Sequence, residues 1–166
     1  EKHPPFQWLI NRRDGTFAAD DGRLTIQGLP AKGISAAFGD LDNDFDQDAL
    51  LFTRAGAPQL LRNERLEGMS QITESPWTDF QRPMWGAALA DVDGNETMDA
   101  VLFAGRDAPV LLLKNDPPGR FQAGFQKLDA RATNGAFFDA ENDGDEDLFL
   151  TDALRSGKRS PALYVN

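Results

Sequence analysis

An acidic segment of nine residues occurs three times in this chain, each time with the same internal spacing. The segments are residues 40–48 (loop 1), 91–99 (loop 2) and 139–147 (loop 3), and their first aspartates lie 51 and 48 residues apart. Each segment places oxygen-bearing side chains at positions 1, 3, 5 and 9. Side chains that alternate at positions 1, 3 and 5 turn inward on a tightly curled loop and form a cage of hard oxygen ligands. Ca²⁺ takes six to eight such ligands, so the spacing predicts three calcium-binding loops.

The charge of these loops supports a bound cation, because two carboxylates about 5 Å apart repel by roughly 3 kcal/mol at an effective dielectric near 20. Position 7 is expected to add a backbone carbonyl, as in the first half of an EF-hand loop. An EF-hand itself is excluded, because position 12 is a leucine in all three loops rather than a glutamate. The predicted ligands of up to three Ca²⁺ ions are Asp40, Asp42, Asp44, Asp46, Asp48, Asp91, Asp93, Asn95, Thr97, Asp99, Asp139, Glu141, Asp143, Asp145 and Asp147.

A second landmark repeats with the same period. Asparagines that end short apolar runs stand at positions 11, 63, 115 and 166, which are 52, 52 and 51 residues apart. Two landmarks with one period near 50 residues indicate a chain built from repeated units.

Each unit consists of short apolar runs bounded by Gly, Pro, Asn and Asp, which predict β-strands and no helices. Four short antiparallel strands in about 50 residues are typical of a β-propeller blade. We therefore expect an all-β chain of about three four-stranded blades that form an incomplete ring. The single propeller segment 1–166 divides into the end of one blade (1–30), blades at 31–79 and 84–129, and a blade at 132–166 that lacks its last strand.

Composition narrows the function. Loops 1 to 3 hold 15 of the 27 acidic residues, and the remaining 12 face 17 Lys and Arg, so the acidity belongs to the loops. No basic patch stands out, which argues against nucleic acid as a partner. The chain has no cysteine and one histidine, which excludes thiol catalysis and histidine triads. No apolar run is long enough for membrane insertion.

On these motifs the chain resembles the FG-GAP and VCBS repeats, a family of calcium-binding propeller blades also found in integrin α-subunits. Loop 1 follows Phe38-Gly39, and Gly56-Ala57-Pro58 comes soon after it. The resemblance implies that each loop joins the first and second strands of a blade and holds Ca²⁺ at the rim of the ring. It also implies an extracellular, cell-surface or periplasmic location.

The loops depart from the family pattern at two places. The family favours Gly at position 6, where the backbone often needs a positive φ, but loops 1 and 2 have Phe45 and Glu96 there. Position 5 of loop 2 is the neutral Asn95. By ligand charge, loop 2 is therefore predicted to be the weakest of the three sites.

Three blades cannot close a ring without exposed edges and apolar faces. We therefore expect the missing blades to come from a longer chain or from a second copy. In a two-fold arrangement, the N-terminal strands of one copy would complete the truncated blade of the other.

Three functions remain open, of which the third is a purely structural spacer in a longer surface protein. The first is a calcium-stabilised scaffold for protein or glycan binding that has no chemistry of its own, with Trp77 and Trp85 as candidates for stacking on sugars. The second is part of a polysaccharide lyase or hydrolase, for which Asp79, Asp107, Asp116, Asp129 and Asp152 are spare carboxylates. A glycosidase needs two carboxylates facing each other across a cleft, and no spacing singles out such a pair. The first function is favoured for that reason.

Overall fold

The computed structural model describes residues 9–19, 33–53, 56–65, 68–72, 83–106, 108–122, 126–155 and 158–165. Within these ranges the chain forms antiparallel β-sheets, none of them closed, and no helix is long and apolar enough to cross a membrane. The prediction of an all-β chain of antiparallel sheets is confirmed, whereas the assignment of these sheets to propeller blades stays a prediction.

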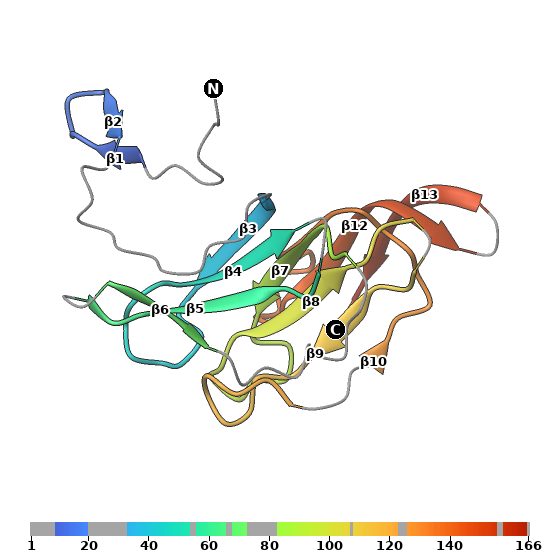
Figure 1. The fold of residues 1–166 in the computed structure, drawn as a ribbon. Helices are drawn as coiled ribbons and strands as arrows, with labels where there is room; N and C mark the ends of the chain where they lie inside the picture. Colours follow the sequence, from blue (N-terminus) through green and yellow to red (C-terminus); the bar gives the residue numbers. More distant parts are fainter. Residues whose placement is uncertain are drawn as a thin grey trace, which may run out of the picture.

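The first two sheets each contain four strands (Figure 1). The first sheet has the order β3 (Gly33–Gly39), β4 (Asp48–Thr53), β5 (Gln59–Asn63) and β6 (Met69–Ile72). The second sheet has the order β7 (Gly86–Ala90), β8 (Asp99–Phe103), β9 (Leu111–Leu113) and β10 (Gln126–Lys127). In both, strands that follow one another along the chain are neighbours in the sheet.

The third sheet has three strands in the order β11 (Gly135–Phe138), β12 (Asp147–Arg155) and β13 (Lys158–Tyr164). Strands β12 and β13 are longer than the sequence predicts. Their pairing shifts register between Leu150 and Ala153 and then continues to Arg155 opposite Lys158. The register shift falls at Pro161, which stands at the repeat position of Pro58 and cannot donate a ladder hydrogen bond.

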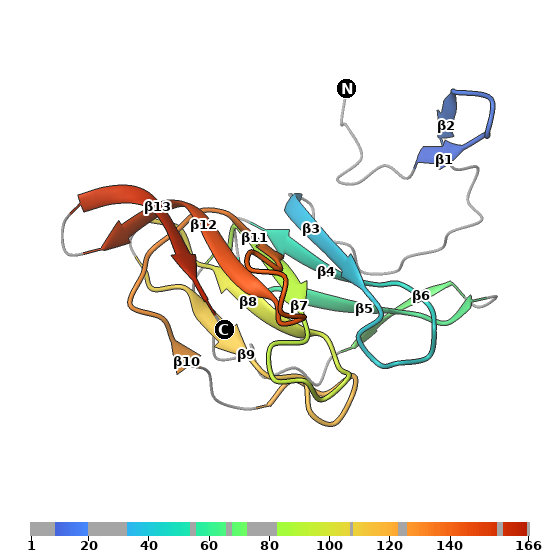
Figure 2. The same ribbon diagram turned by 180° about the vertical axis from the view of Figure 1, so that it is seen from behind.

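A separate two-stranded hairpin consists of β1 (Leu9–Asn11) and β2 (Phe17–Ala19). It stands apart from the three sheets in both views (Figures 1 and 2). Both strands of the hairpin are largely exposed, including Leu9 and Phe17.

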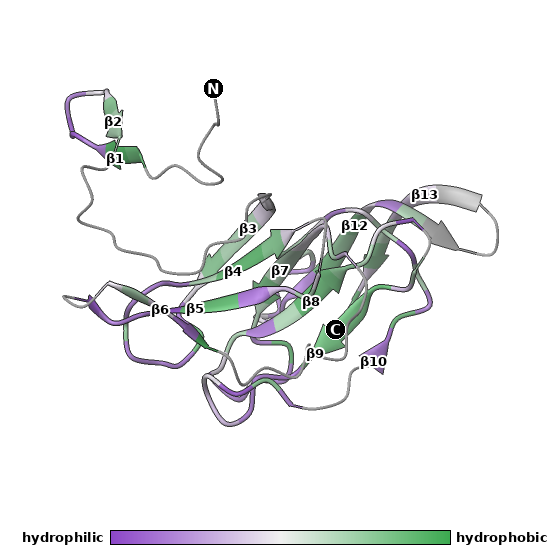
Figure 3. Cartoon of the chain, viewed as in Figure 1, coloured by the Kyte–Doolittle hydropathy of each residue, from purple (hydrophilic) through white to green (hydrophobic). Residues whose placement is uncertain are grey.

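The first strands of the three sheets lie side by side, with β7 between β3 and β11 (Figure 2). The small residues of these strands allow the close approach. A Cβ added to Gly39 at the end of β3 would stand 3.0 Å from Leu89 Cδ1 of β7. The second strands β4 and β8 are buried on both faces, which is why they read as unbroken apolar runs. Figure 3 shows apolar strands at the centre of the sheets and mainly hydrophilic connections, whereas β10 is hydrophilic.

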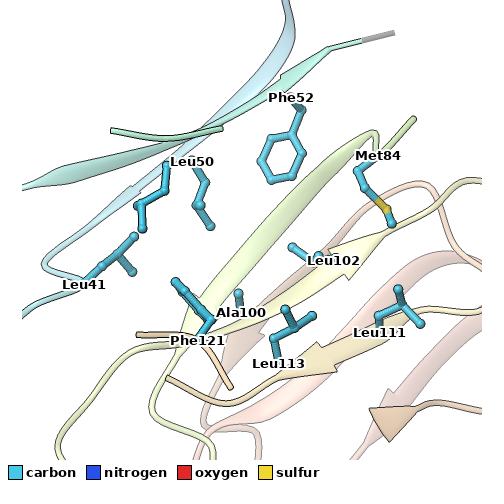
Figure 4. Packing of buried hydrophobic residues seen from close by; sticks show 10 residues of the cluster. Leu41, Leu50, Phe52, Met84, Ala100, Leu102, Leu111, Leu113 and Phe121 are labelled. Carbon is cyan, nitrogen blue, oxygen red and sulfur yellow. The ribbon is translucent and has the colours of Figure 1, made fainter. Parts of the chain in front are cut away.

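Two apolar cores join the sheets, and equivalent repeat positions build both. The core between the first and second sheets (Figure 4) contains Leu41, Leu50, Phe52, Leu60, Met84, Ala100, Leu102, Leu111, Leu113 and Phe121. The core between the second and third sheets contains Val101, Phe103, Val110, Ala130, Ala132, Leu148, Leu150, Ala153 and Ala162. Each core is therefore formed by one face of a sheet and the facing side of the next sheet. This packing fixes the positions of neighbouring loops relative to one another.

Candidate metal sites

Each acidic loop connects the first strand of a sheet to its second strand: β3 to β4, β7 to β8 and β11 to β12. The first strand ends just before position 1, and the second begins at position 9. The two ends of every loop are therefore fixed by strand pairing, as in Gly39 opposite Asp48 and Ala90 opposite Asp99.

The aspartate at position 1 holds the curl of its own loop. In loop 1, the carboxylate of Asp40 accepts hydrogen bonds from the backbone N–H groups of Asp44 (3.1 Å) and Phe45 (2.9 Å). Asp91 and Asp139 accept the same pair of bonds, from positions 5 and 6 of their loops. These bonds lower the pKa of Asp139, so that carboxylate favours its charged form.

The aspartate at position 9 is buried in all three loops and ties the loop to the sheet. Asp48 is 1% exposed and accepts hydrogen bonds from the N–H groups of Leu41 (2.9 Å) and Asn63 (2.8 Å). Asp99 accepts the equivalent bonds from Val92 (3.3 Å) and Asn115 (2.8 Å). Burial raises the pKa of Asp48 to about 6 and raises that of Asp99 as well. A buried carboxylate of this kind gains stability from a cation beside it.

All three loops use a positive φ at positions 4 and 6. At position 6 the angles are 69° at Phe45, 66° at Glu96 and 97° at Gly144. Loops 1 and 2 thus follow the glycine path without glycine, at a cost of about 1–2 kcal/mol each. Sequence reasoning missed position 4, where Asn43 and Asn142 have φ of 60°. The signal was present, because Asn and Gly adopt this conformation most readily.

Positions 1, 3 and 9 come together in loops 1 and 2. Oxygen atoms of Asp40, Asp42 and Asp48 lie within 4.8 Å of one another, and Asp91, Asp93 and Asp99 do the same. Among the described residues, loop 3 forms no such cluster of three. The predicted ligands at position 5 (Asp44, Asn95 and Asp143) instead accept the N–H two residues further on.

In loop 1, one carboxylate oxygen of Asp42 forms an ion pair with a basic side chain, and the other has no hydrogen-bond partner. Arg62 Nε lies 2.7 Å from Asp42 Oδ2, while Oδ1 is buried and makes no hydrogen bond. Burial raises the pKa of Asp42, and the neighbouring charge of Asp44 raises it further. An orphaned buried acceptor in a cluster of three carboxylates fits an oxygen-preferring cation.

Loop 2 has an equivalent base. Lys114 Nζ contacts Asp93 Oδ2, and Lys114 stands directly before Asn115, as Arg62 stands before Asn63. The residue at this place in the third unit is Val165. At position 7, Arg65 contacts Asp46 of loop 1, whereas the Thr97 hydroxyl of loop 2 donates to the carbonyl of Asn115 (2.6 Å). Neither side chain at position 7 was expected to be engaged in this way.

Loop 3 is more exposed than the other two. Its residues from Asp139 to Glu146 are exposed, and only Asp147 at position 9 is buried. Within the described residues, Glu141 at position 3 has no basic partner. Partial desolvation raises its pKa, and the adjacent charge of Asp143 raises it further.

The segment that follows β9 and loop 2 both make direct hydrogen bonds to loop 1. The carbonyl of Leu41 accepts hydrogen bonds from Gly119 N (2.6 Å) and Asn115 Nδ2 (2.7 Å). The side chain of Asn43 donates to the carbonyl of Glu96 in loop 2 (2.9 Å). These contacts span up to 78 residues of sequence (Leu41 to Gly119), so no local pattern could have identified them.

The buried side-chain oxygen of Asn115 has no hydrogen-bond partner. In the equivalent turns, Asn11 accepts from Arg13 N (2.8 Å) and Asn63 accepts from Arg65 N (3.1 Å). The residue two places after Asn115 is Pro117, which has no N–H to donate. The exception therefore follows from one substitution in the repeat.

The remaining sequence candidates are less informative. Trp77, Asp79 and Asp107 lie outside the described residues. Trp85 is half-exposed, and its ring packs against Gly105. Asp152 forms an ion pair with Arg106 at 3.2 Å.

No known family model matches the chain, and no curated protein matches its sequence. The loops themselves therefore carry the functional argument.

Proposed function

We propose that this chain is a calcium-binding β-sheet scaffold of the FG-GAP and VCBS type, in which Ca²⁺ stabilises the loops that connect the first two strands of each sheet. The observation that carries this proposal is loop 1, where Asp40, Asp42 and Asp48 bring oxygens within 4.8 Å and one buried oxygen of Asp42 lacks a partner. Loop 2 repeats the arrangement with Asp91, Asp93 and Asp99.

Calcium would supply charge neutralisation and no reaction. Asp40 and Asp91 already fold their own loops through backbone bonds, and Asp48 and Asp99 link the loops to the third strands. Metal binding would therefore consolidate a loop whose path the protein has already set. Loop 3 has the same backbone curl but exposes the carboxylates at positions 1, 3 and 5, so metal binding there would have to draw these side chains together.

Binding of a protein or a carbohydrate to this scaffold follows from the same proposal, as does a location outside the cytoplasm. Extracellular modules bind Ca²⁺ with dissociation constants of about 10⁻⁴–10⁻³ M, which suits loops that carry neutral or base-paired ligands. No observation favours the hydrolase or lyase alternative.

Calorimetry with Ca²⁺ and thermal unfolding with and without chelator test the proposal. Occupation of two sites at about 100 times their dissociation constants adds about 5 kcal/mol, which raises Tm by about 10 °C or more in a chain of this size. Asp40→Asn combined with Asp91→Asn should remove most of that gain. Absence of binding heat together with an unchanged Tm in chelator would contradict the proposal.

A glycan array probed with and without chelator tests ligand binding separately. Calcium-dependent binding that Trp85→Ala abolishes would identify a carbohydrate-binding surface. Calcium binding without any retained glycan would leave a protein ligand as the remaining expectation.

A further inference from the structure

Side chains from both loops fill the interface between loops 1 and 2. Asn43 at position 4 of loop 1 donates a side-chain hydrogen bond to the carbonyl of Glu96 at position 6 of loop 2 (2.9 Å). Met98 at position 8 of loop 2 packs against Gly39, the residue directly before loop 1, because a Cβ added there would stand 2.7 Å from Met98 Sδ. One polar and one apolar contact therefore close this interface.

The interface between loops 2 and 3 lacks the side chain that makes the polar contact. β7 and β11 lie side by side (Figure 2), so loops 2 and 3, which follow these strands, are neighbours. Position 4 of loop 2 is Gly94, and position 6 of loop 3 is Gly144. A Cβ added to either glycine would meet no atom within 4 Å. Glycine has no side chain to bridge the two loops, so this interface stays open.

An open pocket of about 700 Å³ lies at this second interface. Its lining includes the repeat equivalents of all four residues that close the first interface: Ala90, Gly94, Gly144 and Glu146. A volume of this size is within the range of ligand-binding pockets. The pocket therefore follows from residue differences between two equivalent interfaces, both of which lie inside the described part of the chain.

The lining of the pocket combines apolar side chains with carboxylates. Leu89, Val92 and Met98 supply apolar surface. The carboxylates come from both loops and belong to Asp91, Asp93, Glu96, Asp145 and Glu146. The described lining contains no Lys, Arg or His, and Lys114, which lies outside it, pairs with Asp93. The pocket is therefore complementary to a ligand that carries positive charge.

Two of these carboxylates stay available to a ligand when loop 2 holds Ca²⁺. Glu96 at position 6 and Glu146 at position 8 stand outside the predicted metal-ligand positions, and neither side chain has a partner among the described residues. They belong to different loops, so a cationic group in the pocket can meet one from each side. A cationic head on an apolar stem is the chemistry of a lysine or arginine side chain.

We propose that the pocket between loops 2 and 3 binds a lysine or arginine side chain of a partner protein, presented on an extended segment. Glu96 and Glu146 bind the cationic group, and Leu89 and Met98 contact its aliphatic stem. Gly94 allows the backbone of the partner to approach closely, because it has no side chain. The inference names the partner of the proposed scaffold and rests on that proposed function.

Titration with a capped pentapeptide that has one arginine between two leucines measures this binding, in Ca²⁺ and in chelator. The same peptide with citrulline, the neutral isostere of arginine, should bind at least about tenfold more weakly in both conditions. Binding of Ca²⁺ to the protein alone is measured in a separate titration. A failure of calcium binding and a failure of peptide binding are therefore seen independently.

Gly94→Asn introduces the residue that closes the first interface. Asn tolerates the positive φ of 71° at this position, and its side chain should donate to the carbonyl of Gly144, as Asn43 donates to that of Glu96. We expect the affinity for the arginine peptide to fall at least about tenfold, while loop 2 still binds Ca²⁺, because no predicted ligand is altered.

A double variant, Glu96→Gln with Glu146→Gln, removes the two charges and keeps the shape of the side chains. It should weaken the arginine peptide by about tenfold or more and bring its affinity close to that of the citrulline peptide. Glu64→Gln is the matched control, since Glu64 is an exposed glutamate outside the pocket lining. This control should leave peptide binding unchanged.

No binding of the arginine peptide, or equal binding of the arginine and citrulline peptides, would overturn the proposal. So would equal effects of the pocket variants and the Glu64→Gln control. Retention of a glycan that Gly94→Asn abolishes, without any peptide binding, would also overturn it, since the occupant would then be a carbohydrate. Circular dichroism confirms that each variant remains folded.

Discussion

Loops 1 and 3 have the same spacing of acidic residues but differ in what surrounds them. Residues outside loop 1 hold it in place: Arg62 and Arg65 form ion pairs with its aspartates, and Asn115 and Gly119 donate hydrogen bonds to its backbone. Loop 3 is exposed from Asp139 to Glu146 and forms no cluster of three carboxylates within the described residues. Loop 2 resembles loop 1 in its base and its cluster. One local pattern can therefore produce a pre-ordered site or an open one, depending on neighbours.

Substitutions at the buried position 9 of loop 1 and at an exposed position of loop 3 should differ most in their effect on stability. Asp48→Ala removes the acceptor of two backbone N–H groups in the interior and should destabilise the calcium-free protein by about 2–4 kcal/mol. Asp145→Ala changes an exposed side chain of loop 3 and should alter stability by less than about 0.5 kcal/mol. Urea unfolding in chelator measures both, and similar losses would show that the two loops are equally integrated.

The next largest difference in stability is expected between substitutions of two glycines, one beside loop 1 and one within loop 3. Gly119 has a φ of 77°, and an added Cβ would stand 2.8 Å from Asp42 Cβ. Gly119→Ala should therefore displace the turn from loop 1, cost about 2–3 kcal/mol and weaken calcium binding there. Gly144 has a φ of 97° with open space around it, so Gly144→Ala should cost only about 1 kcal/mol. Thermal unfolding compares the two variants, and equal losses would mean that the turn does not hold loop 1.

Removing or adding a basic side chain beside a loop should change the Ca²⁺ affinity of that loop by a smaller amount. Lys114→Met removes a cation that shares Asp93 with the metal and should tighten calcium binding at loop 2 about fivefold, or about 1 kcal/mol. Val165→Lys places a base at the same repeat position beside loop 3 and should weaken that site by a similar factor. Calorimetric titration measures both changes. Opposite signs would show that the base at this position orients its carboxylate more than it competes with the ion.

The smallest effect concerns the link between loops 1 and 2. Asn43→Gly deletes the hydrogen bond to Glu96, worth about 0.5–1.5 kcal/mol, and leaves the positive φ unstrained, as in Gly94 of loop 2. We expect calcium binding at the two loops to become more independent, with a shallower titration curve. An unchanged curve would mean that the loops bind calcium separately in the unaltered protein.

The sequence predicted the loops well because their construction is local. The bonds from Asp40 reach only four and five residues ahead, and the strands on either side follow from unbroken apolar runs. The ranking of loop 2 as the weakest site rests on Asn95 and stays a prediction. The strain at Phe45 and Glu96 was also foreseen at the level of residue type, although only the structure shows that the loop keeps its path.

The sequence by itself determined the number and spacing of the acidic loops, the all-β class and the repeat, because these depend on neighbours within a few residues. Only the tertiary structure decided which loop is held by residues of other units and which buried carboxylate oxygen is left without a hydrogen-bond partner. Leu41 and Gly119 meet through a backbone hydrogen bond between a loop and a turn, and Val101 and Tyr164 meet because the second and third sheets pack face to face. The side chains at such contacts are set by volume and geometry across the interface, which no spacing along the chain records.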